Sequence, residues 1–224
     1  MQGEPDPSLD FLSSKPLSFN AMDTPEQIIE QLKYLKASAA SRKVVAIAGT
    51  PASGKTTLAH ALADSIPNCA CLSMDGFHLD KPILEAMNLS NRKGSPETFD
   101  VEGFRSLVTR LKQPNDIYIP VFDRSSEKTI NCASLIPSTT EIVVVEGNYL
   151  LFDKPDWREL SHHWDYTIFL ETELTTIERR LMDRWLFHGY SQRAAHAKIS
   201  VNDLPNAHRI LQHALPADLV IKTD

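Results

Sequence analysis

A glycine-rich segment between an apolar run and a helical pattern constrains this chain more than any other feature. It fits the pattern G-x-x-x-x-G-K-S/T, in which glycines let the backbone curl so that successive N–H groups point at phosphate oxygens. Lys55 can reach the outer phosphates of a nucleotide, and the Thr56 hydroxyl can ligate Mg²⁺. The sequence therefore predicts a nucleotide site, whose expected residues are Gly49, Thr50, Pro51, Ala52, Ser53, Gly54, Lys55, Thr56 and Thr57.

Short apolar runs alternate with helical patterns along most of the chain. Residues 44–48 form a continuous apolar run, as in buried parallel strands, while Leu174, Ile177, Leu181 and Trp185 have helical spacing. This alternation predicts an α/β fold with a mainly parallel sheet. The other expected strands are Cys69–Met74, Ile142–Val145, Tyr166–Leu170 and Leu219–Ile221.

The chain is expected to contain a single domain, residues 23–224, after a flexible arm formed by residues 1–22. Pro5, Pro7 and Pro16 lie in this arm among Ser, Asp and Asn, which favour loops. A helix is predicted from Pro25, with Thr24 as its N-cap, to about Ser41. The segment from about Leu79 to Asn131 has few strand signals, and we interpret it as an insertion over the active face.

Composition argues against several classes of protein. The formal net charge of −6 disfavours a general binder of nucleic acids or anionic membranes, although a small anionic ligand could still occupy a local pocket. Three cysteines are too few, and odd in number, for a disulfide framework, and no run of 18 apolar residues predicts a transmembrane helix. The first residues lack the basic and apolar regions of a signal peptide. We therefore expect a cytoplasmic protein.

An acidic residue at the end of the second predicted strand indicates the class of nucleotide-binding protein. Asp75, in the segment Ser73–His78, would lie beside the phosphate loop, where open α/β sheets bind ligands. A carboxylate there could accept the proton of a substrate hydroxyl that attacks the γ-phosphate, or it could simply form a turn with Gly76. His78 is expected to order this loop or to contact substrate. A GTPase is disfavoured because the base-reading motif Asn/Thr-Lys-x-Asp is absent.

A second acidic residue ends the strongest of the later apolar strands. Glu146 follows residues 142–145, and a carboxylate at the end of a strand next to the phosphate-loop strand can bind Mg²⁺ directly or through water. Together with Thr56 it forms the predicted metal site. Cys69 and Cys71 alternate on their strand, so we interpret them as core residues rather than metal ligands.

Five segments together resemble one family of P-loop kinases. GTPASGKTT, SMDGFH, RKGSPETFD, IPVFDR and VVVEGNYLL are similar to the phosphoribulokinase/uridine kinase family, which includes the bacterial-type pantothenate kinases. The greatest similarity is to a branch described as nucleoside/nucleotide kinase-like or as fructose transport kinases, and it extends from about Lys43 to the C-terminus. The resemblance implies a three-layer P-loop NTPase fold with a mainly parallel five-stranded sheet and a helical lid. It also implies ATP and Mg²⁺ as cofactors and a small-molecule hydroxyl as acceptor.

The resemblance also implies roles for residues near the acceptor. Asp75 takes the position of the catalytic carboxylate, and Asp123 with Arg124 takes a substrate-facing position. The family's tyrosine-containing uridine kinase version of the aspartate loop is replaced here by Gly76-Phe77-His78, which is closer to the pantothenate kinase pattern. This departure weakens the case for a nucleoside acceptor.

Further basic and polar residues have two interpretations each. Arg180 and Arg184 lie one turn apart on a predicted helix, and the Asp183 carboxylate could offset the repulsion between their charges. In the resembled family, however, arginines at this place close over ATP. We assign them to the lid, with Arg184 catalytic. Arg92 and its neighbour Lys93 are either solvated or in contact with an anionic group of the substrate. Asn206 lies near the position at which the family holds adenine, as does Asn202, yet Asn is also common at helix starts.

The sequence thus predicts an ATP-dependent kinase that phosphorylates a hydroxyl of a small molecule. The acceptor could be a sugar, a nucleoside or a pantothenate-like alcohol. The alternative is a nucleotide-dependent regulatory ATPase without phosphotransfer, and Asp75 distinguishes the two because a regulatory switch needs no carboxylate directed at an acceptor hydroxyl. No nucleic acid or membrane partner is expected, and a homodimer stays open.

Overall fold

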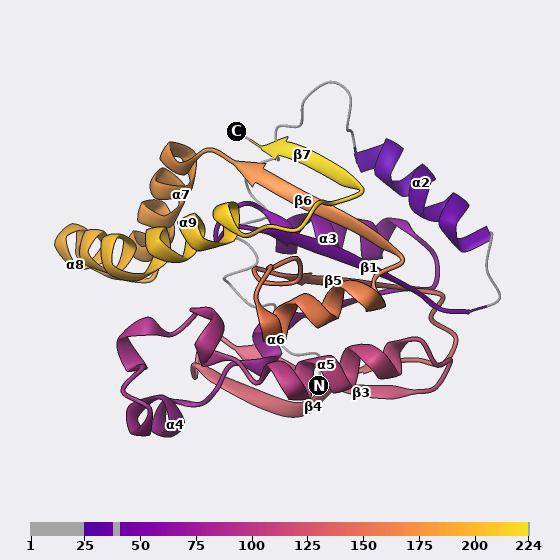
Figure 1. Cartoon of the computed structure of the whole chain (residues 1–224), viewed down its shortest axis with the longest axis horizontal. Coiled ribbons are helices and arrows are strands. Elements are labelled where there is room, and N and C mark those ends of the chain that lie inside the picture. Colours follow the sequence, from indigo (N-terminus) through magenta and orange to yellow (C-terminus); the bar gives the residue numbers. More distant parts are fainter. Residues whose placement is uncertain (1–24, 38–40, 224) are drawn as a thin grey trace.

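A five-stranded parallel sheet lies at the centre of the computed structural model, which describes residues 25–37 and 41–223 (Figure 1). The strand order is β2-β5-β1-β6-β7, and every neighbouring pair is parallel. The central strand β1 pairs Ala46 with Val145 of β5 and Ile47 with Ile168 of β6. The predicted strands are confirmed, with the bounds β1 Lys43–Gly49, β2 Cys69–Ser73, β5 Ile142–Gly147, β6 Tyr166–Thr172 and β7 Leu219–Thr223.

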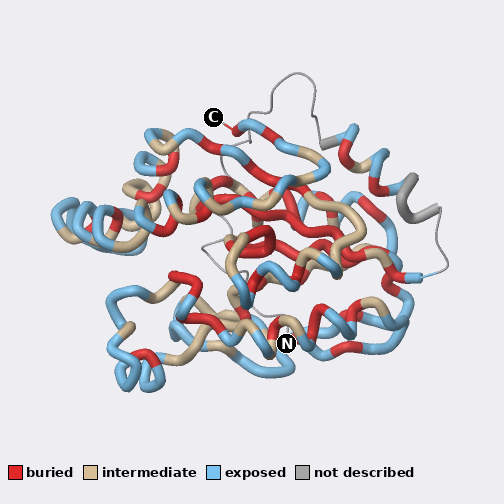
Figure 2. Tube along the Cα trace, in the orientation of Figure 1, coloured by how far each residue is buried: buried red, intermediate tan, exposed pale blue. Residues whose placement is uncertain are grey.

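Helices cover both faces of this sheet, so the fold has three layers. Successive side chains of a strand point to opposite faces, and in β1 both sets are buried (Figure 2). Val45 and Ile47 pack in one apolar cluster, Val44 and Ala46 in another. The first cluster includes residues of α2 Pro25–Ala37 and α3 Lys55–Ser65, and the second includes residues of α5 Val101–Leu111, α6 Pro155–Arg158 and the short helix η4 Glu159–His163.

The first described helix, α2, begins at Pro25 as predicted. It ends at Ala37 rather than near Ser41, which lies in a bend before β1. Its Ile28 and Leu32 are buried in the sheet cluster that also contains α3. The expected cap Thr24 and the expected arm, residues 1–22, lie outside the described residues.

The insertion contains an antiparallel hairpin, which the weak strand signals of this segment did not predict. β3 Ile117–Asp123 pairs with β4 Lys128–Ile136 around an irregularity between Ile119 and Val121. Pro120 interrupts the alternation of β3, and β4 exposes most of its residues, so neither strand has a clear apolar pattern. The insertion also contains α5 and three short elements, α4 Lys81–Ala86, η2 Ser90–Arg92 and η3 Pro96–Thr98, and the short helix η1 Met74–Phe77 lies just before it.

Four helical elements between β6 and β7 extend beyond the carboxyl ends of the strands, and we call them the lid helices (Figure 1). Ile177 and Leu181 are buried, as predicted for this apolar stripe, and they pack with Ala207 and with Ala52 of the phosphate loop. Gly189 follows the end of the first helix with a φ of 80°, a left-handed conformation that suits glycine. The lid helices are α7 Leu174–Phe187, α8 Gln192–Lys198, the π-helix η5 Ile199–Asp203 and α9 Leu204–Gln212.

Candidate active site

The predicted phosphate loop connects β1 to α3 at the edge where the parallel strands end. A Cβ at Gly49 would lie 2.7 Å from the carbonyl oxygen of Leu170 on β6, so the loop starts at a point of close backbone approach. Gly54 has a φ of 96° immediately before α3, again a conformation that glycine adopts without strain. The first N–H groups of an α-helix have no partner within the helix. The loop and α3 together therefore form a site suited to an anion.

Lys55 is buried against this loop, with 6% of its surface exposed. Its Nζ donates hydrogen bonds to the carbonyl oxygen of Thr50 at 2.6 Å and to Ser53 Oγ at 3.4 Å. Burial lowers the pKa of Lys55 to about 8, and the nearby Glu146 and Asp75 limit this shift. An ammonium group held by neutral oxygens in a buried loop is well suited to a phosphate partner.

Glu146, at the end of β5, meets the start of α3. Thr56 Oγ1 donates to its Oε2 at 3.3 Å, and the Ser73 hydroxyl donates to its other carboxylate oxygen. Burial raises the pKa of Glu146, and the negative charge of Asp75 raises it further. A carboxylate and a hydroxyl are the hard oxygen ligands that Mg²⁺ prefers, and a cation would stabilise the ionised form of Glu146. The predicted metal residues therefore lie together and fit Mg²⁺.

Asp75 lies on η1 directly after β2. Its backbone N–H donates to Ser73 Oγ at 3.2 Å, and Arg124 Nη2 donates to its carboxylate at 3.1 Å. Burial acts to raise the pKa of Asp75, but the charges of His78, Arg124 and Arg184 outweigh it and hold the pKa below its ordinary value. The carboxylate is therefore ionised at neutral pH.

A glycine explains how the hairpin reaches this carboxylate. A Cβ at Gly76 would lie 2.6 Å from the carbonyl oxygen of Pro120 on β3. The backbone of the hairpin thus lies directly against η1, and Arg124, which follows β3, comes within reach of Asp75. This close approach gives Gly76 a packing role that the sequence alone did not indicate.

His78 closes η1 and lies between two aromatic rings. Its Nδ1 lies 2.9 Å from the carbonyl oxygen of Asp75, and its ring centroid lies 4.1 Å from that of Phe99 and 4.9 Å from that of Phe122. Burial lowers the pKa of His78, against the opposing effect of Asp75. In the structure His78 therefore orders the aspartate loop, one of its two predicted roles, while contact with substrate stays a prediction.

The two lid arginines approach the site from α7. Arg180 Nη1 donates to the carbonyl oxygen of Ala52 in the phosphate loop at 3.1 Å. Arg184 is half-buried, and burial together with repulsion from Arg124 lowers its pKa to about 10. Trp185, whose ring lies 5.9 Å from the Arg184 guanidinium, donates through Nε1 to Asp203 at 2.7 Å. Arg180 thus contacts the phosphate loop, and Arg184 lies near the charges of Arg124 and Asp75, while their role in closing over ATP stays a prediction.

Three of the predicted site residues contact other groups in this structure. The Asp123 carboxylate accepts hydrogen bonds from the hydroxyls of Ser125 and Ser126 in the hairpin turn. Arg92 Nη2 lies 3.7 Å from Glu97 Oε2 and is largely exposed. The third residue, Asn206, is buried, and its amide nitrogen donates to Asn202 Oδ1 at 3.3 Å. Their proposed contacts with substrate or adenine stay predictions.

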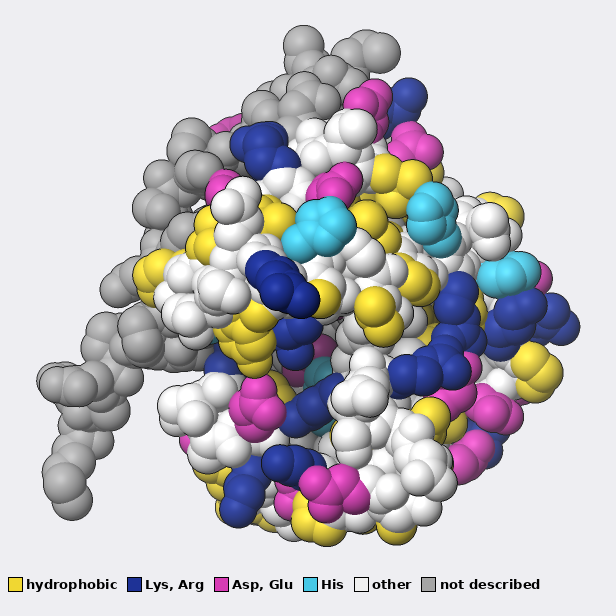
Figure 3. All heavy atoms as spheres, turned by 90° about the vertical axis from the view of Figure 1, so that its left-hand side faces the viewer, with side chains coloured by type: hydrophobic (Ala, Val, Ile, Leu, Met, Phe, Trp, Pro, Cys, Tyr) yellow, Lys and Arg dark blue, Asp and Glu magenta, His cyan; other side chains and the backbone are white. Residues whose placement is uncertain are grey.

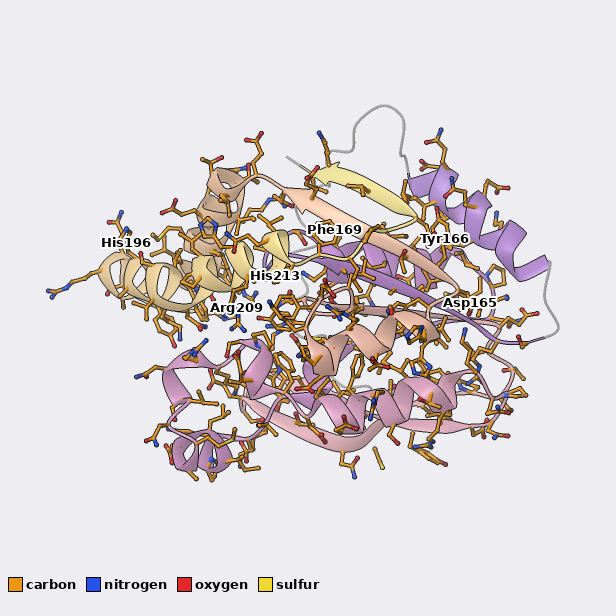
Figure 4. The ribbon with its side chains drawn as sticks, in the orientation of Figure 1. Asp165, Tyr166, Phe169, His196, Arg209 and His213 are labelled. Carbon is orange, nitrogen blue, oxygen red and sulfur yellow. The ribbon has the colours of Figure 1, made fainter. Side chains whose placement is uncertain are left out.

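Sequence reasoning missed several contacts that shape the acceptor side. Ser73, which joins Asp75 to Glu146, could have been noticed because it ends the strand before the aspartate. Glu97 and Arg209 form an ion pair across 112 residues, for which no local pattern exists. Arg209 lies on α9, on the side that faces the insertion (Figure 4).

Basic side chains gather around a hollow on the face at which the carboxyl ends of the parallel strands lie (Figure 3). Acidic and histidine side chains are recessed within this hollow. His78, Arg124, Arg184 and Lys55 supply the positive charge that acts on Asp75. Within residues 25–37 and 41–223 no group of three His, Cys, Asp or Glu side chains is arranged for a metal. In that same part of the chain no helix combines the length and apolar character needed to cross a bilayer.

Known proteins of similar sequence or structure match most of this chain. In Escherichia coli (strain K12) the protein named "Uncharacterized protein YggC" is 34% identical over 189 residues, which cover 81% of this chain and 78% of YggC. The crystal structure of a "putative fructose transport system kinase" from Silicibacter sp. TM1040 matches with a TM-score of 0.84 and a sequence identity of 42%. The match covers 88% of this chain and 98% of the Silicibacter chain. YFH7 from Saccharomyces cerevisiae, at 19% identity, has a TM-score of 0.79 over 90% of this chain and 100% of its own, a likeness of fold.

The decisive match is to a family model. Residues 44–223, which include the phosphate loop, Asp75, Glu146 and the lid helices, match the model described as the phosphoribulokinase/uridine kinase family. The resemblance carried by the five sequence segments is therefore confirmed. This chain belongs to the phosphoribulokinase/uridine kinase family of P-loop kinases.

Proposed function

We propose that this protein is an ATP-dependent kinase that transfers the γ-phosphoryl group to a hydroxyl of a small molecule. The observation that carries the proposal is the ionised carboxylate of Asp75, held by Arg124 at 3.1 Å beside the residues suited to phosphate and Mg²⁺. A protein that only hydrolyses ATP as a switch has no need of this carboxylate.

The phosphate end of the site binds and neutralises the donor. Lys55 and the N–H groups of the loop bind the β- and γ-phosphates, and Thr56 with Glu146 would hold Mg²⁺. When bound, this ion would offset the negative charge that develops on the transferring phosphoryl group. Arg184, on the lid helices, would stabilise the same charge.

At the acceptor end, Asp75 orients the hydroxyl and accepts its proton. The hydroxyl oxygen forms a bond to the γ-phosphorus, the bond from that phosphorus to the β–γ bridging oxygen breaks, and ADP leaves with the electron pair. Because phosphoryl transfer has a loose transition state, positioning the hydroxyl matters more than base strength, and the low pKa of Asp75 is compatible with the role. Arg124 keeps Asp75 ionised and fixes its orientation.

A screen of hydroxyl compounds for ATP consumption tests the proposal. The panel contains sugars, nucleosides and pantothenate-like alcohols, and mass spectrometry detects the phosphorylated product. We expect one class to be phosphorylated, with activity lost in chelator because Thr56 and Glu146 act through Mg²⁺. Lys55→Ala is the matched control, because it should lose ATP affinity in calorimetry while remaining folded.

The regulatory ATPase gives a different result in the same assays. It would hydrolyse ATP slowly without any acceptor, and Asp75→Asn would leave that hydrolysis unchanged. A screen with no phosphorylated product and an unaffected Asp75→Asn variant would therefore refute the kinase proposal.

A further inference from the structure

A bidentate ion pair connects the insertion to the lid helices. Arg209 Nη1 donates to Glu97 Oε2 at 3.2 Å, and its Nη2 donates to Oε1 at 2.5 Å. Glu97 lies on η3 in the insertion, and Arg209 lies on α9. The hydrogen bonds from Arg209 lower the pKa of Glu97 to about 2, so both partners are charged at neutral pH. Paired donors fix the relative orientation of two planar groups as well as their distance.

The loop that carries Glu97, residues 92–98, has further contacts on both sides, and we call it the bridging loop. On the lid side, Asn202 Nδ2 donates to the carbonyl oxygen of Lys93 at 2.8 Å. On the hairpin side, Lys93 Nζ lies 4.9 Å from the ring centroid of Phe122 and donates to the carbonyl oxygen of Glu127 at 3.1 Å. The bridging loop therefore extends from the lid helices to the hairpin that supplies Arg124.

The lid helices in turn form one packed unit with the phosphate loop. Ile177, Leu181 and Ala207 share an apolar cluster with Ala52, and Arg180 donates to the Ala52 carbonyl oxygen. A close-packed cluster of this kind shifts as a body rather than atom by atom. A nucleotide that orders the phosphate loop would thus also order α9, which carries Arg209.

We infer that the Glu97–Arg209 ion pair couples the nucleotide side of the site to the acceptor side, which makes Arg209 a positioning residue for acceptor binding. This inference rests on the proposed kinase function. The pair is partly exposed, with 31% of the Arg209 and 43% of the Glu97 side chain accessible, so it contributes little to overall stability. The Gly94 carbonyl oxygen accepts a hydrogen bond from the hydroxyl of the buried Tyr149 at 2.7 Å, so loss of the pair frees the lid side of the bridging loop while this anchor to the core remains.

Amide hydrogen exchange measured with the nucleotide analogue AMP-PNP and Mg²⁺ tests the coupling. In the wild type, the analogue should slow exchange in residues 92–98. In Arg209→Gln and in Glu97→Gln this protection should fall by about three- to tenfold, while calorimetry gives an unchanged affinity for the analogue. The double variant should lose no more protection than either single variant, because the two residues act as one unit. Arg209→Lys, which keeps the charge, should restore part of it.

Arg105→Gln is the matched control, because it breaks the Glu102–Arg105 ion pair on the exposed face of α5 and should leave the protection unchanged. With an acceptor from the screen, Arg209→Gln should raise the KM for the acceptor about fivefold and that for ATP less than twofold.

Analogue binding without protection of the bridging loop would overturn the coupling alone. Equal protection in the wild type and in Arg209→Gln would do the same. Failure of the wild type to bind the analogue would refute the proposed function and the coupling with it.

Discussion

The two ends of the active site are built from different kinds of sequence information. At the phosphate end, Lys55 contacts Thr50 and Ser53, which lie five and two residues away. At the acceptor end, Asp75 pairs with Arg124 across 49 residues. The phosphate loop is a property of a short segment, to which Glu146 on β5 adds a contact with Thr56 across 90 residues. The acceptor end depends on how the insertion packs against the core. Substitutions at the acceptor end should therefore reduce transfer while nucleotide binding persists.

The largest expected effect comes from Asp75→Asn, which replaces one carboxylate oxygen and should affect only the acceptor end. Asp75→Asn keeps the size of the side chain but cannot accept a proton, so turnover should fall by about 10²–10⁴-fold. ATP affinity in calorimetry should stay within about twofold, because Lys55 and the loop N–H groups are unchanged. A near-wild-type turnover would reduce Asp75 to a turn residue.

At the phosphate end, the affinity for ATP should depend on pH through Lys55. Burial lowers the pKa of Lys55 to about 8, so the free protein loses this positive charge as the pH rises above that value. ATP binds the protonated form better, and its affinity should decrease by about tenfold per pH unit between pH 8 and 9.5. Calorimetry with ATP and Mg²⁺ measures this slope.

Lys55→Arg provides the control, because the guanidinium remains charged throughout this range. Its affinity should show a flat profile above pH 8, whatever its absolute value. A wild-type profile that is equally flat would mean that Lys55 does not contact the phosphates.

The sheet could be predicted from sequence because each of its strands is a short apolar run. The acidic residues of the site could be predicted because they follow such runs. Glu146 directly follows the apolar run of β5, and Asp75 lies two residues after the end of β2. The hairpin could not be predicted, because Pro120 breaks the alternation of β3 and most of β4 is exposed. The Glu97–Arg209 pair joins residues that come together only through tertiary packing.

At Gly76 the hairpin of the insertion packs against η1, and Gly76→Ala should disturb this packing. The added Cβ would lie 2.6 Å from the Pro120 carbonyl oxygen, so the hairpin must move away from η1. Overpacking of this kind costs about 1–3 kcal/mol of stability, which a shift in the thermal midpoint would reveal.

The same shift moves Arg124 relative to Asp75, so turnover of the acceptor should decrease by about tenfold. ATP affinity should change little, because the hydrogen bonds of Lys55 lie within the phosphate loop. An equal loss of ATP affinity would show that the two ends are not separable at this glycine.

The smallest expected effect concerns Asp123, the neighbour of Arg124 on the hairpin. Its carboxylate accepts hydrogen bonds from the hydroxyls of Ser125 and Ser126, and these bonds lower its pKa to about 2. An Asn side chain at this position retains one oxygen acceptor for the turn. Asp123→Asn should therefore change kcat and the KM for the acceptor by no more than about twofold, as for a surface substitution. A loss approaching that of Asp75→Asn would instead mean that Asp123 leaves the turn to bind substrate, and that the acceptor end rearranges when the acceptor enters.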